Sequence, residues 1–238
     1  MRSQSAHAEL ETGTASLRRR RISESTVRRL SVYYRALAAL DAEGYHTISS
    51  QELATRERLT PAQVRKDLSA FGSFGTRGLG YPAKELRARI GQILGIDREW
   101  NVGIVGVGHL GSALVSYREF QKQGFLIKAL FDNDQRKIGS NHKGVTIADI
   151  RDLGAEIKKQ HLAIVIIAVP AAVAQSVCDL AVAAGVKGIL NFAPIRLKAP
   201  SEVVVRTENM AMELEFVSFH LAQHLTRESS ASLGNRPR

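Results

Sequence analysis

The sequence predicts an α/β fold: a doubly wound parallel sheet, preceded by a small winged helical domain and followed by a long amphipathic helix. Three observations predict it. Apolar runs alternate with helical patterns over residues 96–209, capped short helices precede a glycine-rich stretch in residues 21–95, and an apolar stripe at helical spacing fills residues 210–226. We expect tails at residues 1–20 and 227–238, which lack apolar periodicity.

The net charge is +10 and is unevenly distributed, because residues 1–98 hold 17 Lys and Arg against 10 Asp and Glu. A basic first domain indicates a polyanion partner, with a solvated basic face as the alternative. The single cysteine, Cys178, excludes an internal disulfide and fits a reducing, cytoplasmic setting. The longest apolar run, Leu162–Val169, is too short to cross a bilayer, and no apolar segment follows the basic start, so we expect neither a membrane partner nor a secretory signal.

Cap signals define the helices of the first domain. Helical spacing predicts a helix over residues 25–43, which Gly44 ends. A capping box predicts a short helix from Ser49 to about Arg58, and Thr60 followed by proline predicts another to about Ala70. These two short helices form a helix-turn-helix arrangement, and a further helix is expected over Ala83–Leu94.

The second short helix is predicted to present Gln63, Arg65 and Lys66 on its outer face, while Val64 and Leu68 point inward. Arg and Lys can reach guanine, Gln can reach adenine, and either cation can hold a phosphate. These side chains are therefore candidates for DNA contact. The alternative is an ordinary helical subdomain with surface cations.

A glycine-rich stretch at residues 71–81 is expected to form a short β-ribbon, anchored to the helices by its aromatic residues. Arg77 would lie near its tip, where it suits a minor groove, whose negative potential attracts arginine. Ser73 on the same stretch is a further candidate for DNA contact.

The second domain is expected to contain five buried strands, at residues 102–105, 126–131, 163–169, 188–191 and 203–205. Helices are expected between them, at residues 110–123, 149–159 and 171–184.

A G-x-G-x-x-G pattern follows the first of these strands and precedes a helix, which predicts a Rossmann dinucleotide-binding unit. Gly106 would form the tight turn, Gly108 would let the backbone approach a pyrophosphate, and Gly111 would allow helix and strand to pack closely. Asp132 lies 21 residues after Gly111, near the spacing of a carboxylate that binds the ribose 2′-hydroxyl, which favours NAD(H) over NADP(H). The alternatives are a Rossmann domain that has lost its ligand or binds another nucleotide. Further loop residues expected at the cofactor are Val107, His109 and Leu110.

No acid, base or nucleophile accompanies the predicted cofactor. Tyr117 is followed four residues later by Gln121 and not by the lysine of a hydride-transfer pair, and His109 lies inside the glycine loop. No histidine has a readable metal-ligand spacing, so no metal site is expected. We predict sensing and no enzymatic activity. An NAD-dependent dehydrogenase and a constitutive DNA-binding protein with a vestigial nucleotide fold are the alternatives.

Several motifs together resemble the Rex family of redox-sensing transcriptional repressors, over roughly residues 22–225. They are Arg29–Arg35, Gln63–Ser69, Phe71–Tyr81, Gly106–Gly111 and Gly185–Pro194. The resemblance implies a homodimeric repressor that binds operator DNA with NAD+ and is released by NADH.

The resemblance also implies residue roles. The late helix, Met212–Leu225, would swap across the homodimer and cover the partner's cofactor, and Tyr117 would lie near the nicotinamide. Other residues expected at the cofactor are Val169, Pro170, Asn191, Phe192 and Pro194.

One position departs from the family pattern. The family usually has an Asp at the start of the late helix, which can pair with an arginine of the first helix or with the cofactor-site tyrosine. Here the residue is Asn209, while Arg35 and Tyr117 match the partners. An Asn cannot form an ion pair, so the resemblance leaves the electrostatic part of this switch open.

Overall fold

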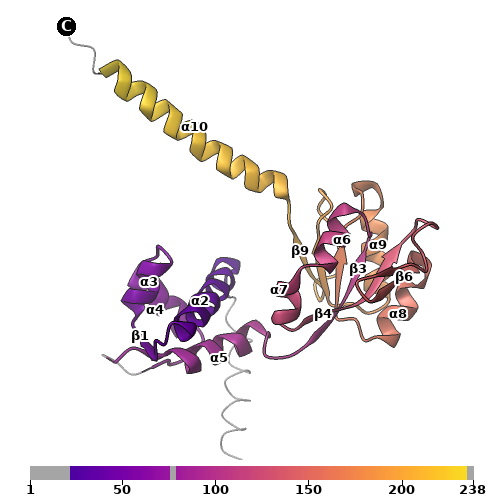
Figure 1. Cartoon of the computed structure of the whole chain (residues 1–238), viewed down its shortest axis with the longest axis horizontal. Helices are drawn as coiled ribbons and strands as arrows, with labels where there is room; N and C mark the ends of the chain where they lie inside the picture. The colour runs from indigo at the N-terminus through magenta and orange to yellow at the C-terminus, as the bar shows by residue number, and fades with distance from the viewer. Residues whose placement is uncertain (1–21, 76–78, 235–238) are drawn as a thin grey trace, which may run out of the picture. The chain divides into compact units, whose positions relative to one another are not determined.

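The computed structural model describes residues 22–75 and 79–234, and the chain divides into two compact units between Arg98 and Glu99. Figure 1 labels most of their elements. The expected tail at residues 1–20 and the candidate Arg77 lie outside the described residues.

The first unit is a helical domain with a two-stranded sheet. Its elements are α2 (Glu24–Ala42), β1 (Thr47–Ile48), α3 (Ser50–Arg56), α4 (Pro61–Ser69), β2 (Tyr81–Pro82) and α5 (Ala83–Leu94). The predicted caps are confirmed: Ser49 and Glu52 form a reciprocal capping box, and the Thr60 hydroxyl accepts a hydrogen bond from the Gln63 amide. Gly44 follows α2 with a φ of +85°. The helix-turn-helix α3–α4 packs on one core with α2 and α5.

The ribbon differs from the prediction. Residues 81–82 pair antiparallel with residues 47–48, so among the described residues the strand partner lies before α3. Gly75 and Gly80 of the glycine-rich stretch lie close together, because a Cβ at Gly75 would lie 2.2 Å from the Gly80 carbonyl oxygen. Its aromatic residues anchor it as expected: Phe71 is buried in the core, and Phe74 lies under the guanidinium of Arg89.

The second unit contains a seven-stranded sheet in the order β5-β6-β4-β3-β7-β8-β9. The strands are β3 (Trp100–Val105), β4 (Phe125–Asp132), β5 (Asn141–His142), β6 (Val145–Asp149), β7 (Ile164–Ile167), β8 (Gly188–Asn191) and β9 (Val204–Thr207). All pairs are parallel except β5–β6. The parallel strands have the Rossmann order, since the chain runs outward from β3 to one side and then from β7 to the other.

Both faces of this sheet are covered, as a doubly wound fold requires (Figure 1). One core joins Phe131 and Ile167 with α8 (Leu153–Lys159) and α9 (Ala171–Ala183). The opposite core joins Ile104, Leu130 and Ile166 with partly buried residues of α6 (His109–Val115) and α7 (Arg118–Lys122). Neighbouring residues of one strand serve opposite cores, which explains why the strands read as continuous apolar runs.

Two expectations are corrected, and one hairpin was not predicted. The helix expected over residues 110–123 is two helices, α6 and α7, because the chain turns at Ser116 and Tyr117. The β5–β6 hairpin was not predicted, since its first strand has two polar residues. The final helix, α10 (Met210–Gly234), continues where the sequence predicts a tail from residue 227.

The glycine loop sets how α6 meets β3. Gly106 has a φ of +94°, and a Cβ there would lie 2.5 Å from the Ala168 carbonyl oxygen. A Cβ at Gly111 would lie only 1.9 Å from the Gly106 carbonyl oxygen. The helix can therefore start at this point of the sheet only because both positions lack a side chain.

We expect Gly111→Ala to destabilise the second unit by about 1–3 kcal/mol or more, because the new methyl group must push α6 away from the loop. Gly154→Ala is the matched control: its Cβ would meet the Ala184 Cβ at 3.8 Å, an ordinary contact, and alanine favours helix by up to about 1 kcal/mol. Denaturant unfolding of both variants measures the difference, and equal midpoints would contradict the close-packing argument.

Candidate functional site

The loops that follow β3, β7 and β8 meet at the carboxyl edge of the sheet. The Gly106 amide donates to the Phe131 carbonyl at 2.8 Å, the Ala168 amide donates to Val105 at 2.8 Å, and the Phe192 amide donates to Ile167 at 2.9 Å. These bonds extend the parallel ladder just beyond the strand ends. The strand order reverses between the paired strands β3 and β7, and ligands of open α/β sheets bind beyond the carboxyl ends of the strands at such a point.

Gly108 lies at this point as the N-cap of α6, with a φ of −85°. A Cβ at Gly108 would have no heavy atom within 4 Å, so its surroundings are open, unlike those of Gly106 and Gly111. His109 and Leu110 beside it are exposed. The first amides of a helix have no partner within the helix and carry partial positive charge, so this turn can hold a phosphate group.

Asp132 ends β4 and is 7% exposed. Its Oδ2 accepts from the Val107 amide at 2.9 Å and from Lys137 Nζ at 3.0 Å, and its Oδ1 accepts from the Asp134 amide at 3.0 Å. Burial raises the pKa of this carboxyl, but the bonds from Asp134, Lys137 and Val107 outweigh it and hold the pKa below its usual value. Three bonds leave room for about one more donor, such as a ribose hydroxyl.

The remaining expected cofactor residues from the β7 and β8 loops also gather at this edge. Val169 packs against the Gly106 turn, where a Cβ would lie 2.8 Å from its Cγ1, and Pro170 is the N-cap of α9. Asn191 is fully buried: its Oδ1 accepts from the Ala193 amide, and its Nδ2 donates to two carbonyls of the same loop. Asn191 therefore shapes the loop that carries Phe192 and the exposed Pro194.

Within a single chain, Tyr117 lies away from the glycine loop. Its ring contacts Phe120 edge to face at 5.0 Å, and Phe120 contacts Phe125, the first residue of β4. The glycine loop lies beside Asp132, the last residue of β4. The structure thus places Tyr117 at the amino edge of the sheet, because α6 runs back along β3 before the chain turns.

We expect Gly108→Ala to lower the affinity for NADH about tenfold or more while changing the stability by less than about 0.5 kcal/mol. The backbone angles suit alanine and the space is open, so only a ligand that approaches the loop would meet the new methyl group. Calorimetric titration and denaturant unfolding of the same variant test this. Unchanged NADH binding would show that the loop does not approach the ligand.

In the first unit, Val64 and Leu68 are buried and Arg65 and Lys66 are exposed, as predicted. Arg65 Nη1 donates to Ser50 Oγ at 2.9 Å. Arg65 and Ser73 line one hollow of about 680 Å³ between the helix-turn-helix and the glycine-rich stretch. The structure therefore brings these two candidates together, while Lys66 stands outside the hollow.

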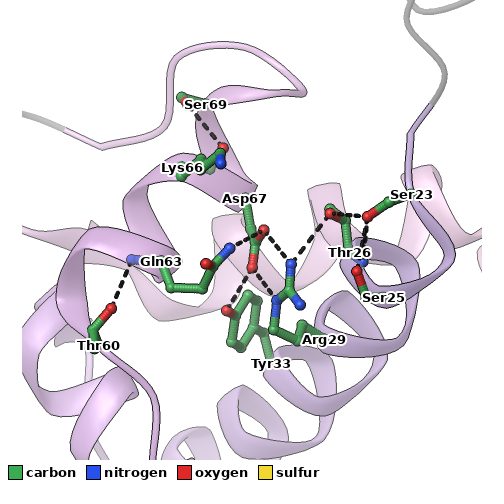
Figure 2. A network of polar contacts seen from close by, with 10 residues as sticks. All are labelled: Ser23, Ser25, Thr26, Arg29, Tyr33, Thr60, Gln63, Lys66, Asp67 and Ser69. Carbon is green, nitrogen blue, oxygen red and sulfur yellow. Dashed lines mark hydrogen bonds and ion pairs between the residues drawn. The ribbon is translucent and has the colours of Figure 1, made fainter.

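Asp67 is a site residue that the sequence analysis missed. It is 2% exposed, and Arg29 from α2 approaches it with two nitrogens, Nε at 2.6 Å and Nη2 at 2.8 Å (Figure 2). Tyr33 and Gln63 also donate to it. Gln63 is therefore turned partly inward and not simply outward as predicted. The sequence offered one sign of this site: Asp67 shares a helix face with the inward residues Val64 and Leu68, and a carboxylate on a buried face requires a cationic partner.

Helix α10 is exposed along residues 210–225. At 100° per residue its large apolar side chains form two opposite faces. The first face contains Met210, Leu214, Val217, Leu221 and Leu225, and the second contains Met212, Phe216 and Phe219. Asn209 caps the helix, because its Oδ1 accepts from the Ala211 amide at 3.0 Å.

Within residues 22–75 and 79–234, no group of three or more His, Cys, Asp or Glu could hold a metal ion. In the same residues, no helix combines the length and apolarity that crossing a membrane requires.

Comparison with known proteins follows the division into two units. A family described as "CoA binding domain" matches residues 97–195, and one described as "Putative DNA-binding protein N-terminus" matches residues 21–69. The redox-sensing transcriptional repressor Rex of Desulforamulus reducens is 46% identical over 85% of this chain and 96% of its own length. The chain belongs to the Rex family of redox-sensing transcriptional repressors.

Other Rex proteins agree. The Streptomyces coelicolor Rex is 42% identical over 96% of this chain and 89% of its own. The Rex-family repressor RSP in complex with β-NAD+ and operator DNA has a TM-score of 0.83 and 34% identity, over 90% of this chain and 99% of RSP. RSP in complex with β-NADH has a TM-score of 0.81 and 34% identity, over 89% of this chain and 99% of RSP.

Proposed function

We propose that this Rex-family chain represses transcription by binding operator DNA as a homodimer, and that NADH releases it while NAD+ permits binding. The observation that carries the proposal is the open turn at Gly108 on a Rossmann switch point, joined in one chain to a capped helix-turn-helix. The similarity to RSP, solved with β-NAD+ and operator DNA and with β-NADH, supports the same pair of ligands here.

In this proposal the loops at the carboxyl edge hold the dinucleotide. The amides around Gly108 would bind the pyrophosphate, the loops carrying Val169, Pro170, Phe192 and Pro194 would enclose the nicotinamide half, and Asp132 would offer its remaining acceptor position to a ribose hydroxyl. A carboxylate there repels a 2′-phosphate, which favours NAD(H). The oxidised nicotinamide ring is cationic and the reduced ring is neutral, so these loops can favour one form over the other.

On the DNA side, α4 would enter the major groove. Arg65 and Lys66 are exposed on it, and Ser73 lines the hollow beside Arg65. One phosphate or base edge can meet Arg65 and Ser73, while Lys66 can contact another phosphate. The predicted minor-groove contact of Arg77 belongs to the same proposal. A homodimer would present two such helices to two half-sites.

Helix α10 would supply the homodimer contact by swapping onto the partner. Its two opposite apolar faces support this, because a helix that is apolar on both sides must be buried on both sides. Leu214, on the first face, is 71% exposed and Phe216, on the second, is 63% exposed. A second copy of the chain can cover both faces.

We expect NADH to raise the apparent dissociation constant for a palindromic operator, while the same concentration of NAD+ does not. A typical coupling free energy corresponds to a change of about 5- to 150-fold. Fluorescence anisotropy titrations of labelled operator DNA with the protein, in the presence of each nucleotide, measure this change. Coincident curves with NADH and NAD+ would contradict the sensing function.

Two variants separate the sites in this titration. Arg65→Ala should weaken DNA binding and leave NADH affinity unchanged, whereas Gly108→Ala should do the reverse. Parallel loss of both activities in either variant would mean that the two roles are not divided between the units as proposed.

We expect Leu221→Glu to convert the homodimer to a monomer at micromolar concentration, because it places a charge in the first apolar face of α10. Ala222→Glu, which adds the same carboxylate on the polar flank beside Glu215, should leave the homodimer intact. Sedimentation analysis distinguishes the 26.1 kDa chain from twice that mass. A Leu221→Glu protein that remains a dimer would place the homodimer contact elsewhere.

A further inference from the structure

The carboxylate of Asp67 is saturated with hydrogen bonds. Arg29 donates to both oxygens, Tyr33 Oη donates to Oδ2 at 2.9 Å, and Gln63 Nε2 donates to Oδ1 at 2.9 Å (Figure 2). A carboxylate has about four acceptor positions, and four donors occupy them. The donors come from α2 and from the first turn of α4, so one buried group joins these two helices.

The charge state of Asp67 determines what it can accept. Burial raises its pKa, but the hydrogen bonds from Arg29, Tyr33 and Gln63 outweigh this, and the pKa is held below the usual value. Burial and the bond to Asp67 also raise the pKa of Tyr33, so its hydroxyl stays protonated and remains a donor. An ionised carboxylate only accepts hydrogen bonds.

The ionised carboxylate of Asp67 decides the orientation of the side-chain amide of Gln63. The oxygen and nitrogen ends of a glutamine are similar in size, and a surface glutamine can present either. Beside an ionised Asp67 only the NH₂ group is favourable, so the carbonyl oxygen must lie on the other side. Figure 2 shows the nitrogen of Gln63 turned towards Asp67 and its oxygen turned away.

The backbone of Gln63 is fixed as well. Its amide donates to the Thr60 hydroxyl at 3.2 Å in the first turn of α4, and the first turns of such recognition helices supply side chains to base edges. The side chain and the backbone of Gln63 are thus both held before DNA binds. A pre-oriented group loses little entropy on binding.

We propose that Asp67 is a positioning residue that sets Gln63 to present its carbonyl oxygen to DNA, so that Gln63 recognises an exocyclic amino group in the major groove. This inference rests on the proposed function. Adenine N6 and cytosine N4 are the two amino groups that the major groove displays, and both donate. The second hydrogen of Gln63 Nε2 adds a contact to N7 only when the base is adenine.

Operator duplexes in which single chemical groups are removed test this, because every base pair displays one amino group in the major groove. In one series, the amino group is removed at each half-site position by replacing adenine with unsubstituted purine or cytosine with 2-pyrimidinone. In a second series, N7 is removed by replacing adenine or guanine with its 7-deaza form. Binding is measured with NAD+ present for the wild-type chain, Gln63→Ala and Asp67→Asn.

We expect one amino deletion to weaken wild-type binding about fivefold or more and Gln63→Ala binding less than twofold. The amide introduced by Asp67→Asn can donate as well as accept, so it no longer fixes the orientation of the Gln63 amide. Operator binding by this variant should therefore weaken less than twofold on the same amino deletion. Asp67→Asn in the Gln63→Ala background should change the sensitivity no further. Tyr33→Phe is the matched control: it removes one bond to Asp67 but not the one to Gln63, and should keep the fivefold sensitivity.

The outcomes distinguish a failure of the proposed function from a failure of the proposed role of Gln63 and Asp67. If the wild-type chain binds no palindromic operator with NAD+, the proposed function fails. If it binds but Gln63 confers sensitivity only to 7-deaza substitution, or Asp67→Asn keeps the amino sensitivity, this inference is overturned. If Asp67→Asn does not fold, as circular dichroism would report, the comparison of wild type with Gln63→Ala still decides which atom Gln63 presents.

Discussion

The contact between Gly106 and Gly111 determines the geometry of the second unit. With 1.9 Å between the Gly106 oxygen and the place of a Cβ at Gly111, helix α6 starts directly against the turn that ends β3. This brings the first turn of α6 to the switch point of the sheet, beside the loops that follow β7 and β8. It also leaves Gly108 as the outermost point of the turn. The tight contact between Gly106 and Gly111 thus accompanies an open position at Gly108, where a ligand can approach the backbone.

Each unit contains a buried carboxylate that accepts a hydrogen bond from another element. Asp132 ties the end of β4 to the glycine loop through the Val107 amide, and Asp67 ties α4 to α2 through Arg29. The spacing predicts a ribose ligand for Asp132, yet three protein donors already bind it. Its first task is therefore to hold the loop. A charge that is paired and hydrogen-bonded in this way costs less to bury than an isolated one, whereas removing one partner would leave the other unpaired in the interior.

The parts of the fold that follow from local rules could be predicted from the sequence. Capping residues placed the starts of α3 and α4, and the strand at residues 188–191 agrees with its apolar run. Contacts between distant segments could not be predicted. Asp67 and Arg29 are 38 residues apart, and a two-residue strand such as β5 has too few residues to show alternation. The position of Tyr117 depended on the turn between α6 and α7, which no proline or glycine marks.

The substitution at residue 209 can be separated into a structural and an electrostatic part. Asn and Asp are equally good N-caps, and Asn209 caps α10 through its side-chain oxygen, so the helix begins as it would with the family's Asp. What Asn209 lacks is the charge that would attract Arg35. Under the proposed function, a signal that passes through α10 would then depend on the packing of its two apolar faces and on uncharged hydrogen bonds. Salt screens such interactions much less than it screens an exposed ion pair. The coupling between cofactor and DNA would therefore vary less with ionic strength than DNA binding itself, which depends on phosphate contacts.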